Sequence, residues 1–378
     1  MTADKEADSK RQLDIGMKIT EEGLAKMRSW IGKPGRLRYG RNTTAGIDNI
    51  RHWTQGYGDD NPLWSDEDYA KKTKWGTIIA PPGFEQTYGQ VEVGGLPGVH
   101  ALYTGDEWEF FQPIRVDDKI TFSGGLIRVN ELPSKLAGRT IEHVAETIYT
   151  NQDKQVVTRR HHIVRRFERK AAQKSGKYSG VTRRIYTPAE IEAIDADYDK
   201  EERRGATPRY WEDVNPGDSL GHVVKGPLTL TDIVAYYMGQ RPSAHVWAHK
   251  LFLQYRREHP RAATLDKFGI PGPIERVHYD DSMATDAGVG ASYDFGDQRI
   301  VWTVHLLTNW MGDAGFLRKL GVQIRRPNYI GDTSWFRGKV IEKEIKDGLH
   351  LVHCEMWGES QRAQHTKATA TIELPSRG

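Results

Sequence analysis

One short stretch of this sequence occurs twice. It reads WSDEDYA at residues 64–70 and HYDDSMA at residues 278–284, an offset of 214 positions. Many matches at one fixed offset are typical of a duplicated domain, so the chain is predicted to hold two copies of one fold. The most informative difference is His278, which stands where the first copy has Trp64. The same offset also aligns Gly76 with Gly290, Pro113 with Pro327, Asp118 with Asp332, Phe122 with Phe336, and Gly124 with Gly338.

The duplication divides the chain into two domains and a linker. The first domain is assigned to residues 13–170 and the second to residues 207–378, each long enough for a hydrophobic core of its own. Residues 171–206 form the linker, which begins with a charged stretch rich in small residues. Thr187, Pro188 and Glu190 together are a helix-start signal, with Thr as the cap, Pro at the first helical position and Glu three residues after the Thr. This linker helix is expected to run to about Arg203.

Within each copy, helical periodicity comes first and strand periodicity follows. In the first copy, helices are predicted near residues 44–56 and 84–91, and strands over residues 139–150 and 154–167. In the second copy, residues 300–311 are apolar nearly all round, which is typical of a buried helix. This order indicates an α+β fold in which an antiparallel sheet packs on a central helix.

Composition excludes several classes of function. Lys and Arg number 54 against 51 acidic residues, whereas a dedicated nucleic-acid binder usually has a marked basic excess. The single cysteine, Cys354, cannot form an intrachain disulfide, and no run reaches the roughly 18 apolar residues of a membrane-spanning helix. The charged start of the chain is unlike a secretory signal. These features predict a cytoplasmic protein that binds neither nucleic acid nor membrane.

The segment GDDNPLWSD at residues 58–66 is similar to the signature of the MaoC-like (R)-specific enoyl-CoA hydratases. In words, that signature is Gly-Asp-any-Asn-Pro-Leu-His-any-Asp. The first copy keeps its Asp as Asp59 but has Trp64 in place of the His. The second copy keeps the His as His278 but has Pro273 in place of the Asp. The resemblance covers nearly the whole chain and implies a double hotdog, with an antiparallel sheet wrapped around a central helix in each copy.

The resemblance also implies a reaction, the reversible hydration of an enoyl thioester carried by coenzyme A or acyl carrier protein. No cofactor and no metal is expected, and the protein is expected to be a homo-oligomer. In this chemistry a carboxylate and a histidine hold a water and move its protons, while a backbone N–H stabilises the thioester oxygen. By resemblance, His278 is the acid/base group, Gly296 is the oxyanion donor and Asp59 is the matching carboxylate of the first copy.

The partner of His278 is left open by the sequence, because each copy keeps one half of the catalytic pair. Asp59, Asp281 and Glu275 are the candidate carboxylates, and Gln240 is a candidate amide. An insert that precedes His278 in the second copy is expected to rebuild the pocket. The candidate substrate-binding residues of this rebuilt pocket are Tyr236, Tyr237, Gln240, Arg241 and His245.

Three further features each carry two interpretations. Trp64 is expected to fill the former pocket of the first copy, or else to form a wall for a bulky acyl group. The basic residues between Arg159 and Arg166 are expected to form a solvated strand face, or else to hold the phosphates of coenzyme A. Arg325 and Arg326 allow the same two interpretations, and Arg326 is retained as a substrate-binding candidate. His245 and His249 have the spacing of metal ligands but no evident third ligand, so a metal site is not expected.

Three functions remain on the sequence alone. A hydro-lyase acting on 2-enoyl or 3-hydroxyacyl thioesters is favoured, with the second copy catalytic and the first copy shaping the acyl pocket. A hotdog thioesterase would share the fold and would not need an intact Asp–His pair. A non-catalytic acyl-binding subunit of a hydratase complex would explain why both signatures are broken.

Overall fold

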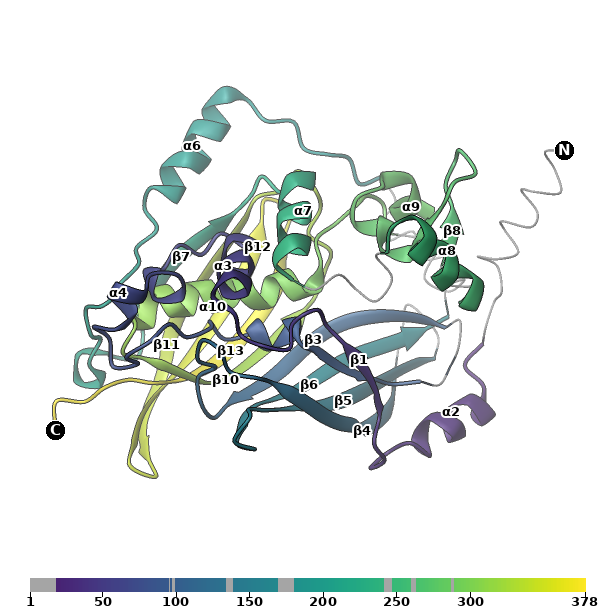
Figure 1. The fold of residues 1–378 in the computed structure, drawn as a ribbon. Coiled ribbons are helices and arrows are strands. Elements are labelled where there is room, and N and C mark those ends of the chain that lie inside the picture. The colour runs from purple at the N-terminus through teal and green to yellow at the C-terminus, as the bar shows by residue number, and fades with distance from the viewer. Residues whose placement is uncertain are drawn as a thin grey trace, which may run out of the picture.

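The computed structural model describes residues 18–94, 96, 99–133, 139–168, 180–240, 247–259, 263–286 and 289–378. Within this part of the chain, one antiparallel sheet of nine strands is the main element, in the order β4-β5-β6-β3-β10-β13-β12-β11-β7. Figure 1 shows the helices gathered on one side of this sheet. Two short pairs of strands, β1 with β2 and β8 with β9, lie outside it.

Each half of the chain contributes four long strands to the sheet. The first half supplies β3 (His100–Phe110), β4 (Thr121–Leu132), β5 (Thr140–Thr150) and β6 (Val156–Phe167). The second half supplies β10 (Phe316–Ile324), β11 (Ser334–Lys346), β12 (Leu349–Ser360) and β13 (Gln364–Glu373), and β7 (Ser219–Lys225) extends its edge. The halves join where β3 pairs with β10, with Trp108 opposite Leu320. The strands predicted over residues 139–150 and 154–167 are confirmed.

The central helix of the second half is α10 (Gly296–Met311), which lies against the sheet. Every residue from Gln298 to Met311 is buried, so the prediction of a buried helix is confirmed. Above it, α3 (Ile47–Gln55) packs against α7 (Leu230–Gly239), as Figure 1 shows. The remaining helices are α2 (Glu21–Arg28), α4 (Glu67–Ala70), α6 (Pro188–Tyr198), α8 (His249–Glu258) and α9 (Asp281–Asp286); β8 is Ala263–Leu265, β9 is Pro271–Pro273, and η3 is the 3-10 turn Trp211–Asp213.

The linker helix α6 begins as predicted. The Thr187 side chain accepts from the backbone N–H of Glu190, and the Glu190 side chain accepts from the backbone N–H of Thr187, which completes a capping box. The helix ends at Tyr198, earlier than the expected end near Arg203. The domain boundaries stay a prediction, because the main sheet runs without a break from one half to the other.

Among its described residues, the first half has no long central helix. Where the repeat would place it, the chain forms only a 3-10 turn, η2 (Phe84–Thr87), followed by β2 (Gly89–Glu92), which pairs with β1 (Arg36–Tyr39). The helix predicted near residues 84–91 is therefore wrong. Gly89 has φ +131°, and a Cβ there would lie 2.2 Å from the carbonyl oxygen of Arg38, so this pairing requires glycine.

The hydrophobic core of the first half is divided in two where its described residues form no long central helix. A large cluster runs from α3 and β3 through α10 into the second half of the sheet. A second, smaller cluster lies at the far end of the first half, where α2 packs its Leu24 and Met27 against Leu126 of β4 and Ile141 of β5. The inner face of the first half thus carries two apolar clusters instead of one continuous core.

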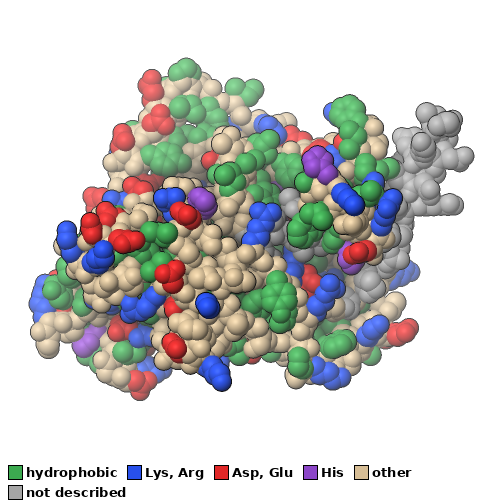
Figure 2. Space-filling view, viewed as in Figure 1, with side chains coloured by type: hydrophobic (Ala, Val, Ile, Leu, Met, Phe, Trp, Pro, Cys, Tyr) green, Lys and Arg blue, Asp and Glu red, His purple; other side chains and the backbone are tan. Residues whose placement is uncertain are grey.

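The surface agrees with the near-balanced charge of the sequence. Figure 2 shows Lys and Arg side chains interspersed with Asp and Glu over the visible face. Among the described residues, no helix is both long and apolar enough to cross a membrane.

Candidate active site at the start of helix α10

His278 and Trp64 end the same local structure in the two halves. Trp64 closes the 3-10 turn η1 (Pro62–Trp64) before α4, and His278 closes the 3-10 turn η4 (Ile274–His278) before α9. Asp66 accepts a hydrogen bond from the backbone N–H of Tyr69 at 3.0 Å. Asp280 likewise accepts from the backbone N–H groups of Ser282 and Met283. The repeat therefore exists in three dimensions, and both aspartates are helix caps.

The His278 ring is held in one tautomer. Its Nδ1 lies 2.9 Å from the carbonyl oxygen of Tyr293, which only accepts, so Nδ1 carries the proton and Nε2 keeps a lone pair. Burial lowers the pKa of His278 to about 4, although hydrogen bonds to backbone oxygens act in the opposite direction. The imidazole is therefore neutral at pH 7 and can accept a proton at Nε2.

Aromatic side chains surround this imidazole. The ring of Phe295 lies 3.8 Å from that of His278, centroid to centroid. Tyr237 packs edge-on against Phe295 at 4.7 Å, and Tyr236 contacts it at 6.1 Å. The hydroxyls of Tyr236 and Tyr237 are buried and, within the described part of the chain, have no hydrogen-bond partner. Buried hydroxyls without partners are rare in a finished core, and they indicate a place where water or a ligand binds.

Gly296 is the first residue of α10, so its N–H has no partner within the helix. The positive end of the helix dipole lies at the same point. Tyr103 of the first half closes one side, because a Cβ on residue 296 would lie 2.4 Å from its Cδ1 atom. The helix start is fixed by a buried ion pair in which Arg299 contacts Asp294 at 2.6 and 2.7 Å. His278 and Gly296 are therefore brought together through Phe295.

The corresponding place in the first half is occupied by the protein itself. Gly83 is the N-cap residue just before η2, and its N–H donates to the Glu85 carboxylate at 2.9 Å. Trp64 is 3% exposed and borders a small cavity of about 40 Å³ together with Trp75 and Phe316. The expectation that Trp64 fills a former pocket agrees with this burial, whereas a role as a wall for an acyl group remains a prediction.

Asp59 lies elsewhere. Its carboxylate accepts from the Tyr57 hydroxyl at 3.2 Å and from the Asn61 backbone N–H at 3.0 Å, and burial raises its pKa. Lys225, which acts electrostatically on Asp59, lies 2.7 Å from Nδ1 of His305 on α10. His305 is nine residues beyond Gly296, or about 14 Å along the helix axis. The structure therefore does not bring Asp59 and His278 together.

The other candidates differ in how close they come to His278. Glu275 is buried on the same 3-10 turn, and its charge adds to the burial that raises the pKa of Tyr237. Asp281 is already engaged by Ser292 and Arg183. The Gln240 amide donates to Gln86 at 3.3 Å. The Arg326 side chain is exposed, and Arg241 and His245 lie outside the described residues. No group of three or more potential metal ligands occurs among the residues described.

The basic run of β6 was expected to be one solvated face, but its residues alternate between the two faces of the sheet. Arg159, His161 and Arg165 point outward and contact Glu109, Glu146 and Glu142 respectively. Arg160 is 1% exposed and pairs with the buried Asp106, so the expectation is wrong for this residue. Sequence reasoning also missed Phe295, whose position just before Gly296 was the available signal.

Comparisons with known proteins relate this chain to hydratases and dehydratases. Residues 35–160 match the family model of the FAS1-like dehydratase domain region. A probable enoyl-CoA hydratase alpha subunit from Thermomonospora curvata is 25% identical over 181 residues, which cover 42% of this chain and 56% of that protein. The solved structure of a MaoC-like dehydratase aligns with a TM-score of 0.62 at 14% identity, covering 92% of this chain and 100% of that one. This chain is therefore similar in fold to MaoC-like dehydratases.

The fold of this chain is a double hotdog. A protein from Mycobacterium tuberculosis whose structure is described as a double hotdog aligns with a TM-score of 0.53 at 10% identity, covering 90% of this chain and 96% of that one. The predicted α+β class and the duplicated hotdog are thus confirmed. The departure from this fold is in the first half, which keeps its sheet but, among the described residues, has no long central helix.

Proposed function

We propose that this protein hydrates a 2-enoyl thioester reversibly to a 3-hydroxyacyl thioester, and that the second half is catalytic. Water adds its oxygen to C3 and gives one proton to Nε2 of His278, and His278 then returns a proton to C2, so that one water is consumed and the imidazole is neutral again. The Gly296 N–H donates to the thioester oxygen, which gains negative charge as C3 is attacked. The observation that carries the proposal is a neutral, single-tautomer His278 next to Gly296, whose N–H has no partner within α10.

Glu275 is the carboxylate that we assign as the partner of His278. It is buried on the same turn and lies within electrostatic range of Tyr237, whereas Asp281 is engaged elsewhere and Asp59 lies farther along α10. The free hydroxyls of Tyr236 and Tyr237 would hold the water or the substrate oxygen. The thioester carrier, coenzyme A or acyl carrier protein, and a homo-oligomeric state belong to the same proposal.

The test is the hydration rate of a His278→Gln variant, followed by loss of the ultraviolet absorbance of the conjugated enoyl thioester. General acid–base catalysis contributes typically 10²–10⁴-fold, so the rate should fall by at least about a hundredfold. His161→Ala is the matched control, because His161 lies on the outer face of the sheet against Glu146 and should keep the full rate. A folded His278→Gln variant with the rate of wild type would exclude the assignment.

A second candidate is favoured by one observation, the name of the Thermomonospora curvata relative, which is described as an alpha subunit. On this proposal the chain binds the acyl thioester and is active only with a second protein. Tight binding of an enoyl thioester by the isolated chain without turnover would favour it. Release of free thiol without hydration would instead favour a thioesterase.

A further inference from the structure

The inner face of the first half carries a row of polar side chains in the space between the two hydrophobic clusters. On β6, Arg160, His162, Val164 and Arg166 alternate with the outward residues, so they share one face. The face is the inner one, because Arg160 also contacts Gln90 of β2 and Asp297 of α10. Opposite them on β5 stand Thr147, Ala145, His143 and Ile141, in register.

The end of this row nearest the candidate active site is fully compensated. Arg160 pairs with Asp106 at 2.6 Å, and Nδ1 of His162 lies 2.9 Å from the same carboxylate. The His162 ring also stacks on Tyr103 at 4.7 Å, and Tyr103 is the side chain that lies against Gly296. This end of the row is therefore structural, and it lies beside the start of α10.

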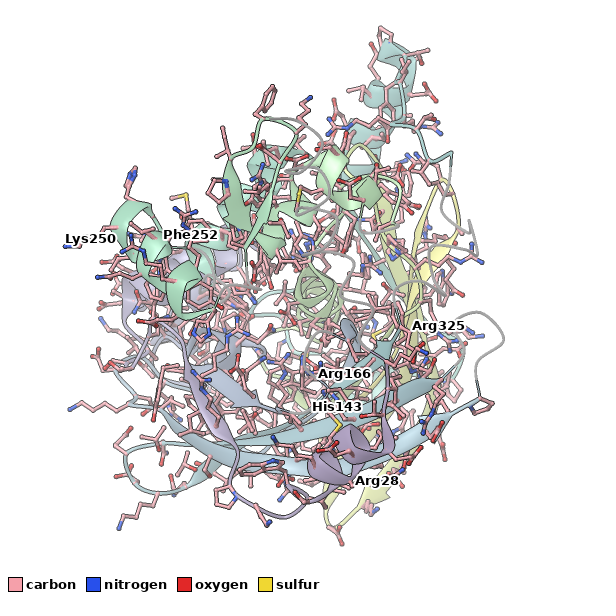
Figure 3. All side chains as sticks on the ribbon, turned by 90° about the vertical axis from the view of Figure 1, so that its right-hand side faces the viewer. Arg28, His143, Arg166, Lys250, Phe252 and Arg325 are labelled. Atoms are coloured by element: carbon pink, nitrogen blue, oxygen red, sulfur yellow. The ribbon has the colours of Figure 1, made fainter. Side chains whose placement is uncertain are left out.

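The far end is not compensated. Arg166 forms no ion pair with any described residue, and its buried Nε has no hydrogen-bond partner there. His143 is 4% exposed, and its Nδ1 likewise lacks a partner within the described ranges. Burial, with Arg166 as the next cause, lowers the pKa of His143 to about 3, so the imidazole is neutral and adds no second positive charge beside the guanidinium. Figure 3 shows the two side chains next to each other on the strands of the first half.

A partly buried cation without a partner is costly, and proteins normally satisfy such a group with an anion. We propose that Arg166 and His143 form a subsite for an anionic group of the thioester substrate, a carboxylate or a phosphate. The guanidinium offers a bidentate fork to the anion, and the imidazole N–H adds one donor. The subsite rests on the proposed function, which places the thioester at Gly296.

The distance between Arg166 and the candidate active site suits one substrate that contacts both. Arg166 lies four residues beyond His162 on the same strand, a distance of about 13 Å. In the second half α10 covers the inner face of the sheet, whereas the described part of the first half has only short elements there, namely η2, β2 and α2. Two sources can supply the anion, a carboxylate at the end of the acyl chain or a phosphate of the carrier.

The experiment compares Arg166→Gln with Arg165→Gln. Arg165 is the neighbouring residue on β6, but it points outward and pairs with Glu142, so it controls for loss of one positive charge from this strand. Binding is measured by calorimetry with variants that also carry His278→Gln, so that no turnover is required. The probes are free coenzyme A, a medium-chain enoyl-CoA with a neutral end, and the same thioester with a terminal carboxylate.

If the anion is a carboxylate at the end of the acyl chain, the protein with intact Arg166 should bind the carboxylated thioester at least tenfold more tightly than the neutral one. Arg166→Gln then removes this preference, and Arg165→Gln retains it. For a carrier phosphate, Arg166→Gln weakens free coenzyme A and both thioesters by a similar factor. Equal binding of all probes by the Arg166→Gln and Arg165→Gln proteins would overturn the subsite. Normal hydration by His278→Gln alone would instead overturn the proposed function and leave the binding result standing.

Discussion

The backbone N–H of Gly83 donates to the carboxylate of Glu85 at 2.9 Å, at the place where the first half would begin its central helix. The second half begins α10 with Gly296, whose N–H is free of such a contact within the helix. The residue that corresponds to Gly296, the first residue of η2, is Phe84, and its N–H donates to the carbonyl oxygen of Pro81 at 3.1 Å. The first half thus satisfies both donors at this point, whereas the second half presents the Gly296 N–H beside a neutral histidine. The asymmetry of the proposed activity follows from this difference between the two helix starts as much as from His278 and Trp64.

Restoring histidine in the first half should not restore catalysis. In a His278→Gln background, Trp64→His is expected to show no recovered hydration, because Glu85 still occupies the Gly83 N–H. The change also removes a large side chain that is 3% exposed, so it should destabilise the protein by about 2–4 kcal/mol. Hydration assays and urea unfolding measure the two effects, and hydration above the His278→Gln background would refute the explanation.

Gly296→Ala should reduce both activity and stability. The new Cβ would lie 2.4 Å from Tyr103 and 2.7 Å from Ile324, and overpacking of this kind costs about 1–3 kcal/mol. Gly94→Ala is the control, because a Cβ on residue 94 would meet no atom within 4 Å and the φ of Gly94 is not positive. Thermal unfolding checks stability, and partial rescue by Tyr103→Leu would confirm the steric cause. Unchanged unfolding of Gly296→Ala would contradict it.

The pH dependence should reflect the lowered pKa of His278. Because this pKa falls to about 4, the imidazole stays neutral and kcat/KM should hold nearly constant from pH 7 down to about pH 5. A histidine of ordinary pKa, about 6.5, would already lose most of its neutral form there. The check is a pH–rate profile with circular dichroism at each pH. A limb centred near 6.5 in folded protein would count against the assignment.

Stability should fall on the acid side for the same reason. Between about pH 6.5 and pH 4 the unfolded chain binds a proton at His278 that the folded chain does not, so stability present above 6.5 is lost as the pH falls. His143, whose pKa falls to about 3, adds to the loss over a wider window. Urea midpoints measured from pH 7 to pH 5 should decrease, and should decrease less in His143→Gln. Equal slopes for the two proteins would argue against the contribution of His143.

The ion pair between Arg299 and Asp294 should behave as a buried pair. Arg299→Met alone leaves the Asp294 carboxylate, which is 0% exposed, without its partner, and should cost about 3–5 kcal/mol. Asp294→Asn combined with Arg299→Met should recover part of that loss, because no buried charge is then left unpaired. The two free energies of unfolding give the comparison. A double variant less stable than Arg299→Met alone would contradict this account.

Much of the fold was predictable because its signals are local. The caps Asp66 and Asp280, the apolar helix at residues 300–311 and the alternating strands each depend on residues near in sequence. The loss of the first central helix was not predicted, because it depends on the contact of Gly89 with Arg38 across a strand pair. The sequence left the separation of Asp59 from His278 open, because it depends on tertiary packing that couples Asp59 to Lys225 beside His305, nine residues along α10 from Gly296.

The pairing of β3 with β10 couples the stability of the two halves. Backbone hydrogen bonds cross it from Asp106–Glu109 to Lys319–Val322, so the strands of one half serve as the template for the other. Since such ladders break cooperatively, severing the linker should yield fragments that reassociate instead of two free-standing modules. This shared ladder would therefore hold the proposed recognition site of the first half in alignment with the proposed catalytic site of the second half.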